Sequence, residues 1–279
     1  MAESAIQRQP IPALRPFIKL IWAADERKPQ ASNRMVRTDR ERLLPSGAMH
    51  LVFRLNDSPI RIFDSVDDPE GETFRRGVIG GTRAGFYVKD ISESGRTVGA
   101  MLQPGASKLL FGAGADEFAG RHTGVDDVWG QDANRLWEAL GEVMDLDRQM
   151  NIFEQFLIRR LPRVFGVHPA IAHALSRFSS TLDIGEIVNE TGYSHRRFIE
   201  LFRRDVGLPP KTFTRLIRFQ RTLKLFEKKS PWIDMSLEAG FSDQAHFNRE
   251  FREFTGVTPS EYLLTRTGDS LHLPIGAAK

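Results

Sequence analysis

The sequence contains no cysteine among its 279 residues. Disulfide bonds and thiolate metal sites are therefore excluded, and the composition suits a reducing compartment. No run of about 18 consecutive apolar residues occurs, so we expect no helix that crosses a membrane. The first residues lack a basic start followed by an apolar run, which predicts a cytoplasmic location.

Motifs that would indicate catalysis are also lacking. Ser46 and Ser107 lie in no G-x-S-x-G sequence, so neither is expected to be a nucleophile. His50 could share a metal with Glu41 or Glu72, but no H-x-H pair or regularly placed second histidine accompanies it. We interpret His50 as an ordinary histidine of a sheet. We therefore expect no enzyme, no metal site and no cofactor.

The net charge of the whole chain is small, but the charged residues are unevenly distributed. The net charge is +3. Residues 1–149 carry a net charge of −2 and residues 150–279 a net charge of +5, while residues 196–229 alone hold 11 basic and 3 acidic side chains. Such a local density can neutralise several phosphates, although a solvated helix surface would also be basic.

What the sequence does have is a short amphipathic segment at residues 194–207, SHRRFIELFRRDVG. Phe198, Leu201 and Phe202 recur at helical spacing and form one apolar stripe. Ser194 can cap the start of this helix and Gly207 can end it. The residues away from the stripe are free to contact a partner: Arg196, Ile199, Glu200 and Arg203.

A second short helix is expected just before this one. Asp183 and Glu186 have capping-box spacing, and the apolar residues that follow have helical spacing up to Gly192. Two short helices joined by a tight turn that contains glycine are typical of a helix-turn-helix, whose second helix enters the DNA major groove.

This arrangement repeats about 48 residues later, where ETGYS at 190–194 is matched by EAGFS at 238–242. After the second turn Phe247, Phe251 and Phe254 form the apolar stripe. Residues 209–227 between the two copies predict one helix with proline in its first turn. Two recognition helices joined by such a rod could read one face of a duplex about 34 Å apart. Five polar or small residues lie away from the second stripe: Gln244, Ala245, Asn248, Arg249 and Arg252.

Residues 171–266 resemble the double helix-turn-helix domain of AraC-type bacterial transcription regulators. The most specific motifs are GFS at 240–242, HFNR at 246–249 and G-x-x-P-x-x-Y at 256–262. The resemblance implies base reading by the first recognition helix through Arg196, Ile199 and Glu200. In the second helix it implies base reading through Gln244, Ala245, Asn248 and Arg249. The remaining predicted DNA contacts, phosphate contacts among them, are His195, Arg203, Arg204, Lys211, Arg218 and Arg252.

Residues 12–103 contain short apolar or alternating runs separated by turn residues, which predict a β-rich barrel or sandwich followed by helices. LPSG at 44–47, LQPG at 102–105 and ADEF at 115–118 resemble a barely characterised domain often found ahead of AraC-type DNA-binding domains, loosely related to cupin-like domains. This resemblance implies a sensory or dimerisation role and names no ligand. Trp22, Trp129 and Trp137 could line an apolar pocket or simply fill the core.

The sequence thus predicts an α+β protein with a β-rich N-terminal domain and an all-α double helix-turn-helix domain. We expect the N-terminal domain at 1–161, a linker at 162–168, the DNA-binding domain at 169–267 and a tail at 268–279. Expected partners are promoter DNA, with RNA polymerase, a small-molecule effector and a second copy of the chain as candidates. A fused enzyme and a non-specific architectural DNA protein are the alternatives.

Overall fold

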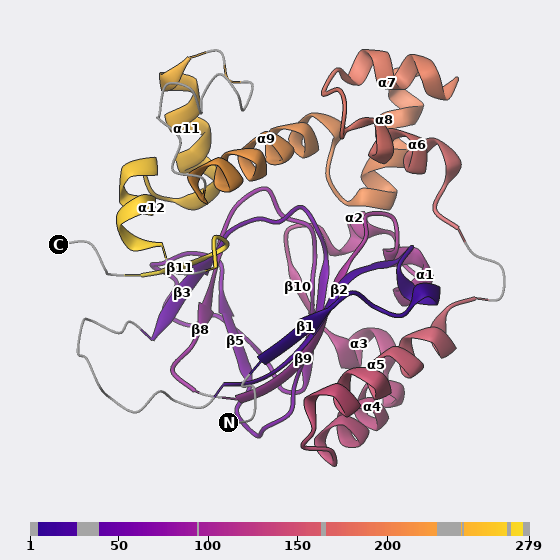
Figure 1. The fold of residues 1–279 in the computed structure, drawn as a ribbon, viewed down its shortest axis with the longest axis vertical. Helices are drawn as coiled ribbons and strands as arrows, with labels where there is room; N and C mark the ends of the chain where they lie inside the picture. The colour runs from indigo at the N-terminus through magenta and orange to yellow at the C-terminus, as the bar shows by residue number, and fades with distance from the viewer. Residues whose placement is uncertain are drawn as a thin grey trace.

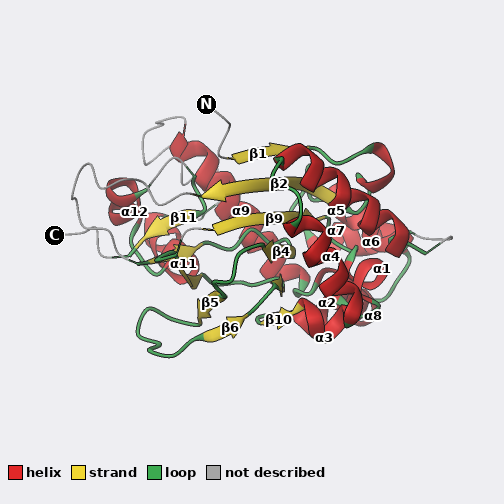
Figure 2. Cartoon of the chain, turned by 90° about the horizontal axis from the view of Figure 1, so that it is seen from below, coloured by secondary structure: helices red, strands yellow, loops and turns green. Residues whose placement is uncertain are grey.

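The computed structural model describes residues 5–26, 39–93, 95–162, 166–227, 241, 243–266 and 269–275. Two antiparallel sheets and a set of small helices form the N-terminal part, and helices alone form most of the C-terminal part (Figures 1 and 2). Within these residues no helix is both long and apolar enough to span a bilayer.

The larger sheet has six strands, and its outer face carries the main core of the protein. Val98, Ala100 and Leu102 of one strand are buried on the same face as Leu51 and Phe53 of its neighbour. Successive residues of a strand point to opposite faces of a sheet, so these side chains share one face. In spatial order the strands are β1 (Ala5–Arg8), β2 (Ile18–Glu26), β9 (Gly95–Leu102), β4 (His50–Arg54), β7 (Gly77–Gly80) and β10 (His122–Gly124).

Five helices that follow β9 in the chain cover that face, with β10 lying between the second and the third of them. They are α1 (Ser107–Phe111), α2 (Ala115–Phe118), α3 (Val125–Trp129), α4 (Gln131–Gly141) and α5 (Leu146–Arg160). Phe153 and Leu157 of α5 are fully buried against the sheet, and α5 packs on β1, β2 and β9. Trp129 is buried in the same core and donates from Nε1 to Leu110 O at 3.1 Å, so its polar atom is satisfied.

The smaller sheet has five strands and faces the larger one through a separate apolar cluster. Ile60, Ile62 and Tyr87 from the smaller sheet contact Val78 and Val52 of the larger sheet there. In order the strands are β11 (His272–Pro274), β3 (Arg40–Leu43), β8 (Tyr87–Asp90), β5 (Ile60–Phe63) and β6 (Glu72–Phe74). Its edge strand β11 comes from the C-terminal end of the chain, which the sequence did not indicate.

The C-terminal helices lie along one side of the two sheets (Figure 1). The long helix α9 separates two groups, with α6, α7 and α8 on one side and α11 and α12 on the other. The bounds are α6 (Pro169–Arg177), α7 (Ile184–Thr191), α8 (His195–Val206), α9 (Pro210–Glu227), α11 (Gln244–Thr255) and α12 (Pro259–Thr265).

The predicted fold class is confirmed, with a β-rich part followed by an all-helical part. Of the two architectures left open, the chain forms two separate facing sheets and not one closed sheet. Strands β1, β3, β6 and β10 are short and were not recognised as separate runs. The repeat residues 238–240 and 242 lie outside the described residues.

Candidate nucleic-acid interface

The first helix-turn-helix has its own apolar core. Phe198, Leu201 and Phe202 of α8 are buried together with Ile187 and Val188 of α7. The stripe predicted for residues 194–207 is therefore confirmed. Its burial fixes which side of α8 is left for contact with a partner.

The ends of both helices are fixed by the residues that the sequence indicated. Ser194 accepts a hydrogen bond from Arg197 N at 3.3 Å, and Asp183 accepts from Gly185 N at 2.8 Å. Gly192 and Gly207 end α7 and α8 with φ of 72° and 86°, a left-handed conformation that favours glycine. Local capping thus defines the turn between the two helices.

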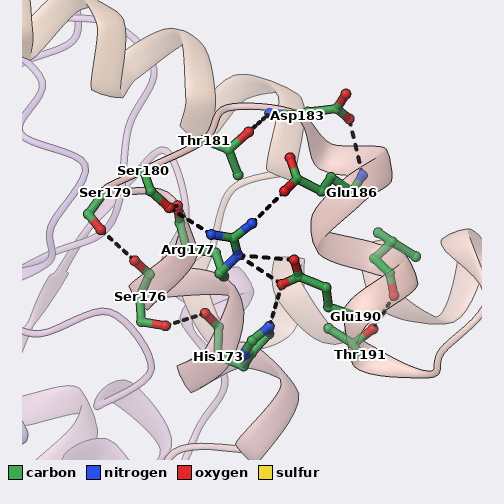
Figure 3. Close-up of polar contacts among 11 residues, drawn as sticks. His173, Ser176, Arg177, Ser179, Ser180, Thr181, Asp183, Glu186, Glu190 and Thr191 are labelled. Atoms are coloured by element: carbon green, nitrogen blue, oxygen red, sulfur yellow. Dashed lines mark hydrogen bonds and ion pairs between the residues drawn. The ribbon is translucent and has the colours of Figure 1, made fainter.

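An ion-pair cluster holds α6 against α7 (Figure 3). Arg177 of α6 contacts Glu186 at 2.5 Å and Glu190 at 2.8 Å, and His173 lies 2.7 Å from the same Glu190 carboxylate. The hydrogen bond from Arg177 holds the pKa of Glu190 below its usual value. The cluster is solvent-exposed, so it fixes the geometry of the helix pair more than it adds stability.

The face of α8 opposite its core is open to solvent. Arg196 has 92% of its side chain exposed and Ile199 is 44% exposed. Glu200 lies between two arginines, 3.3 Å from Arg196 and 3.4 Å from Arg197. These positions were predicted to be free for contact, and the structure leaves them exposed at the N-terminal end of the helix.

The second recognition helix, α11, shows the same division. Phe247, Phe251 and Phe254 are at most 1% exposed, as their spacing predicts. Asp243 caps the helix by accepting from His246 N at 2.7 Å. The predicted contact residues on its other side are all exposed: Gln244, Ala245, Asn248, Arg249 and Arg252.

Helix α9 joins the two halves and holds α11 by an ion pair. Arg215 lies 2.9 Å from Glu250 and 2.5 Å from Glu253 of α11, and Glu250 is only 3% exposed. From another turn of α9, Arg221 donates to Phe178 O at the end of α6 at 3.2 Å. Helix α9 therefore contacts both halves of the helical part. The sequence did not indicate these contacts.

The residues predicted to bind phosphate do not share one environment. Arg203 and Lys211 are exposed. Arg204 is paired with Asp205 at 2.7 Å and lies near Gly114, in the loop before α2. Arg218 is half-buried, with its guanidinium 5.8 Å from the Phe241 ring centroid. Arg203 and Lys211 are therefore better placed for an external phosphate than the other two.

A second group of titratable side chains lies between the two sheets. The Tyr87 hydroxyl is 3.4 Å from His50 Nε2, and the Tyr87 and His122 rings are 4.5 Å apart. Burial lowers the pKa of His50 to about 4 and that of His122 to about 2, and it raises the pKa of Tyr87. All three are therefore neutral near pH 7. No group of three or more His, Cys, Asp or Glu in the described ranges is placed to hold a metal ion.

Both parts of the chain match known domain families. Residues 172–265 match a helix-turn-helix domain and residues 6–124 match a domain of unknown function. The arabinose operon regulatory protein of Escherichia coli is 27% identical over 124 residues, or 40% of this chain and 42% of that protein. The transcriptional activator AarP of Providencia stuartii is 29% identical over 91 residues, 32% of this chain and 67% of that protein.

Among solved structures, ToxT from Vibrio cholerae aligns over 94% of this chain and 98% of its own length, with a TM-score of 0.45 and 12% identity. The aligned segment spans less than half the length of the arabinose regulator. The chain therefore carries a helix-turn-helix domain over residues 172–265, behind a domain of unknown function.

Proposed function

We propose that this protein is a sequence-specific DNA-binding transcription regulator that reads two successive major grooves with α8 and α11. The observation that carries the proposal is the pair of capped helices, each held by a buried phenylalanine stripe and each exposing a polar face. The 18 residues of α9 span about 27 Å at 1.5 Å per residue, near the roughly 34 Å between successive grooves on one face of DNA.

Base reading is assigned to the exposed N-terminal part of each recognition helix. Arg249 suits bidentate pairing with guanine, and Asn248 or Gln244 suits adenine. In α8, Arg196 and Glu200 are paired with each other, so a base contact by Glu200 requires that pair to open. Arg203 and Lys211 are assigned to phosphates, which position the protein without reading sequence.

The test is selection of binding sites from random duplexes by the full chain, followed by footprinting. A regulator must protect one defined site that contains two separable half-sites. Arg249→Ala should lose that preference, whereas Arg75→Ala, which removes an exposed arginine of the N-terminal part, should keep it. Uniform binding to all duplexes would favour the architectural alternative and contradict the proposal.

The N-terminal part is assigned a modulating role through a small molecule. His50, Tyr87 and His122 are neutral polar groups that contact one another between the two sheets, and their hydrogen-bonding atoms suit an uncharged ligand. Titration with uncharged metabolites should change DNA affinity, and the same ligands should bind more tightly or more weakly in the presence of DNA, since coupling is reciprocal. RNA polymerase contact stays a prediction from the resemblance.

Self-association is assigned to the open groove between α4 and α5. The groove has a volume of about 860 Å³, and Leu136, Ile152 and Phe156 contribute apolar surface to it. Asp132 and Arg159 lie in the same groove, and Asp132 is paired with Arg160 at 2.9 Å. Two copies related by a twofold axis could pair opposite charges across the groove if Asp132 shares its carboxylate with the second copy. Sedimentation of the full chain tests this, and Ile152→Glu should then yield monomers.

A further inference from the structure

Residues 269–275, which we call the C-terminal clasp, tie the end of the DNA-binding half to the N-terminal sheet. After α12 the chain returns and β11 pairs antiparallel with β3, so that Leu273 lies opposite Arg42. Backbone hydrogen bonds extend beyond the paired residues, from Leu44 N to Leu271 O at 2.9 Å and from Ile275 N to Arg40 O at 3.3 Å.

The clasp presents a different side chain to each half of the molecule. Leu273 is completely buried in the core that holds α9, α11 and α12 together. His272 projects from the other face of β11 and its Nδ1 lies 2.9 Å from Glu41 Oε1. Residues that are adjacent in a strand point to opposite faces of the sheet, so both contacts form at once.

The N-terminal domain also supplies part of the core of the second helix-turn-helix. Leu44 is 4% exposed in the same cluster as Phe251 and Phe254, and Phe86 packs against that cluster. A Cβ on Gly256, at the end of α11, would lie 2.5 Å from the Phe86 ring. The second half is therefore built onto the N-terminal domain and does not merely follow it along the chain.

The first half contacts the same body through α8, whose C-terminal end packs on α2. Both recognition helices are thus held by one support, which leaves their contact faces open, because Arg196 and Arg249 remain exposed. The N-terminal domain therefore does not cover the faces that are predicted to contact DNA. What it restrains is the orientation of one recognition helix relative to the other.

We propose that the C-terminal clasp is a specificity-determining element that sets the spacing of the two DNA half-sites which the protein accepts. The inference rests on the proposed function. The competing explanation is that α9 alone fixes the spacing, through Arg215 and Arg221. Helix α9 is packed into the cores of both halves, through Phe213 on one side and Phe219 and Phe226 on the other. A single helix can still bend along its length, whereas a second connection through β11 closes a loop and restricts that motion.

A reversible lock distinguishes the two explanations. Leu43 and His272 are directly opposite and lie between the hydrogen-bonded pairs of β3 and β11, where Cα atoms are about 4.5 Å apart and a disulfide fits. Because the chain has no native cysteine, Leu43→Cys/His272→Cys makes a single bond. Adding Leu273→Ala loosens the clasp in the reduced protein, and oxidation closes it again.

The measurement uses the full chain and the site that the wild-type protein selects from random duplexes. One base pair inserted between the half-sites turns one of them by about 34° and shifts it by about 3.4 Å. We expect wild-type and oxidised triple variant to lose at least about tenfold in affinity, and the reduced triple variant less than about threefold. Leu264→Ala, which removes an 84% exposed leucine of α12, is the matched control and should behave as wild type.

Two checks separate folding from specificity. Circular dichroism must show the same helix content in all variants, and Leu273→Ala alone should repeat the reduced result without any cysteine. If the inserted base pair lowers the affinity of the oxidised and the reduced triple variant by the same factor, the proposed role of the clasp is wrong and the proposed function still stands. Failure of the wild-type protein to select any site would overturn the proposed function and the clasp's role with it.

Discussion

Gly207, the residue that ends α8, lies directly against Thr82 of the N-terminal domain. A Cβ on Gly207 would come within 2.1 Å of Thr82 Oγ1 and 2.9 Å of Ala115 O, and the glycine has φ of 86°. The glycine that ends α8 is therefore also a point where the helical part packs closely on the N-terminal part.

Gly207→Ala should consequently cost more stability than the same change at Gly192. Gly192 has a similar φ of 72° but nothing within 4 Å of its Cβ position, so only backbone strain of about 1 kcal/mol is expected there. At Gly207 the clash with a backbone oxygen adds roughly 1 to 3 kcal/mol. Denaturant unfolding of both variants measures the difference, and equal losses would show that α8 and α2 do not pack closely.

The buried ion pair between α9 and α11 predicts a non-additive double mutant. Arg215→Met should lower the free energy of unfolding by roughly 2 to 4 kcal/mol, because the buried Glu250 then keeps only His246, 3.1 Å away, as an ion-pair partner. Arg215→Met/Glu250→Leu should recover most of that loss. Thermal unfolding of the two singles and the double completes the cycle, and simple addition of the single losses would contradict a coupled pair.

Base contacts and phosphate contacts should differ in their response to salt and sequence. Arg249→Ala should weaken binding by roughly 1 to 3 kcal/mol and relax the preference at one base position. Arg203→Ala should weaken all sequences alike and reduce the salt slope by about 1. Titrations at several salt concentrations, on the selected site and on single-base variants, separate the two. Identical sequence-independent losses would mean that α11 does not read bases.

The stability that the His272–Glu41 pair of the clasp contributes should be greatest at an intermediate pH. Burial by itself lowers the pKa of His272, but the hydrogen bond and charge of Glu41 outweigh it, so the pKa lies above the ordinary 6.5. For Glu41, burial by itself raises the pKa. The hydrogen bond and charge of His272, together with Lys89, outweigh the effect of burial, so the pKa of Glu41 lies below the ordinary 4.5. Lys89 and Asp269 also face His272. The histidine's contribution is lost as pH rises through its raised pKa, and the glutamate's as pH falls through its lowered pKa.

Both contributions are therefore fully present between about pH 4.5 and 6.5. The difference in melting temperature between wild type and His272→Gln should be largest near the middle of that window and should shrink at alkaline pH. His50 and His122 destabilise both proteins equally as pH falls, so they cancel in the difference. A difference that grows with pH would contradict the charged pair.

The N-terminal histidines give the opposite dependence. His50 and His122 have folded-state pKa values of about 4 and about 2, both below the ordinary 6.5. The unfolded chain thus binds more protons below pH 6.5, and the folded state loses stability as the pH falls. His122→Phe should flatten this acid dependence in urea unfolding at pH 5 relative to pH 7. An unchanged slope would indicate that the two rings are open to water.

By itself the sequence determined the elements whose signals are local. The stripes of α8 and α11 repeat every three or four residues, and Ser194, Asp183, Gly192 and Gly207 act on backbone groups within one turn. A buried stripe leaves the opposite side exposed whatever else surrounds the helix. For that reason the exposed faces of α8 and α11 could be predicted without a structure.

Only the tertiary structure decided how the halves are joined. The three residues of β11 carry no pattern of their own, and their pairing with β3 links residues more than 200 positions apart in the chain. Leu44 belongs to a motif that resembles the N-terminal domain, yet it lies in the core of the second helix-turn-helix. Such contacts depend on which surfaces meet after the local elements have formed, and no periodicity along the chain encodes that.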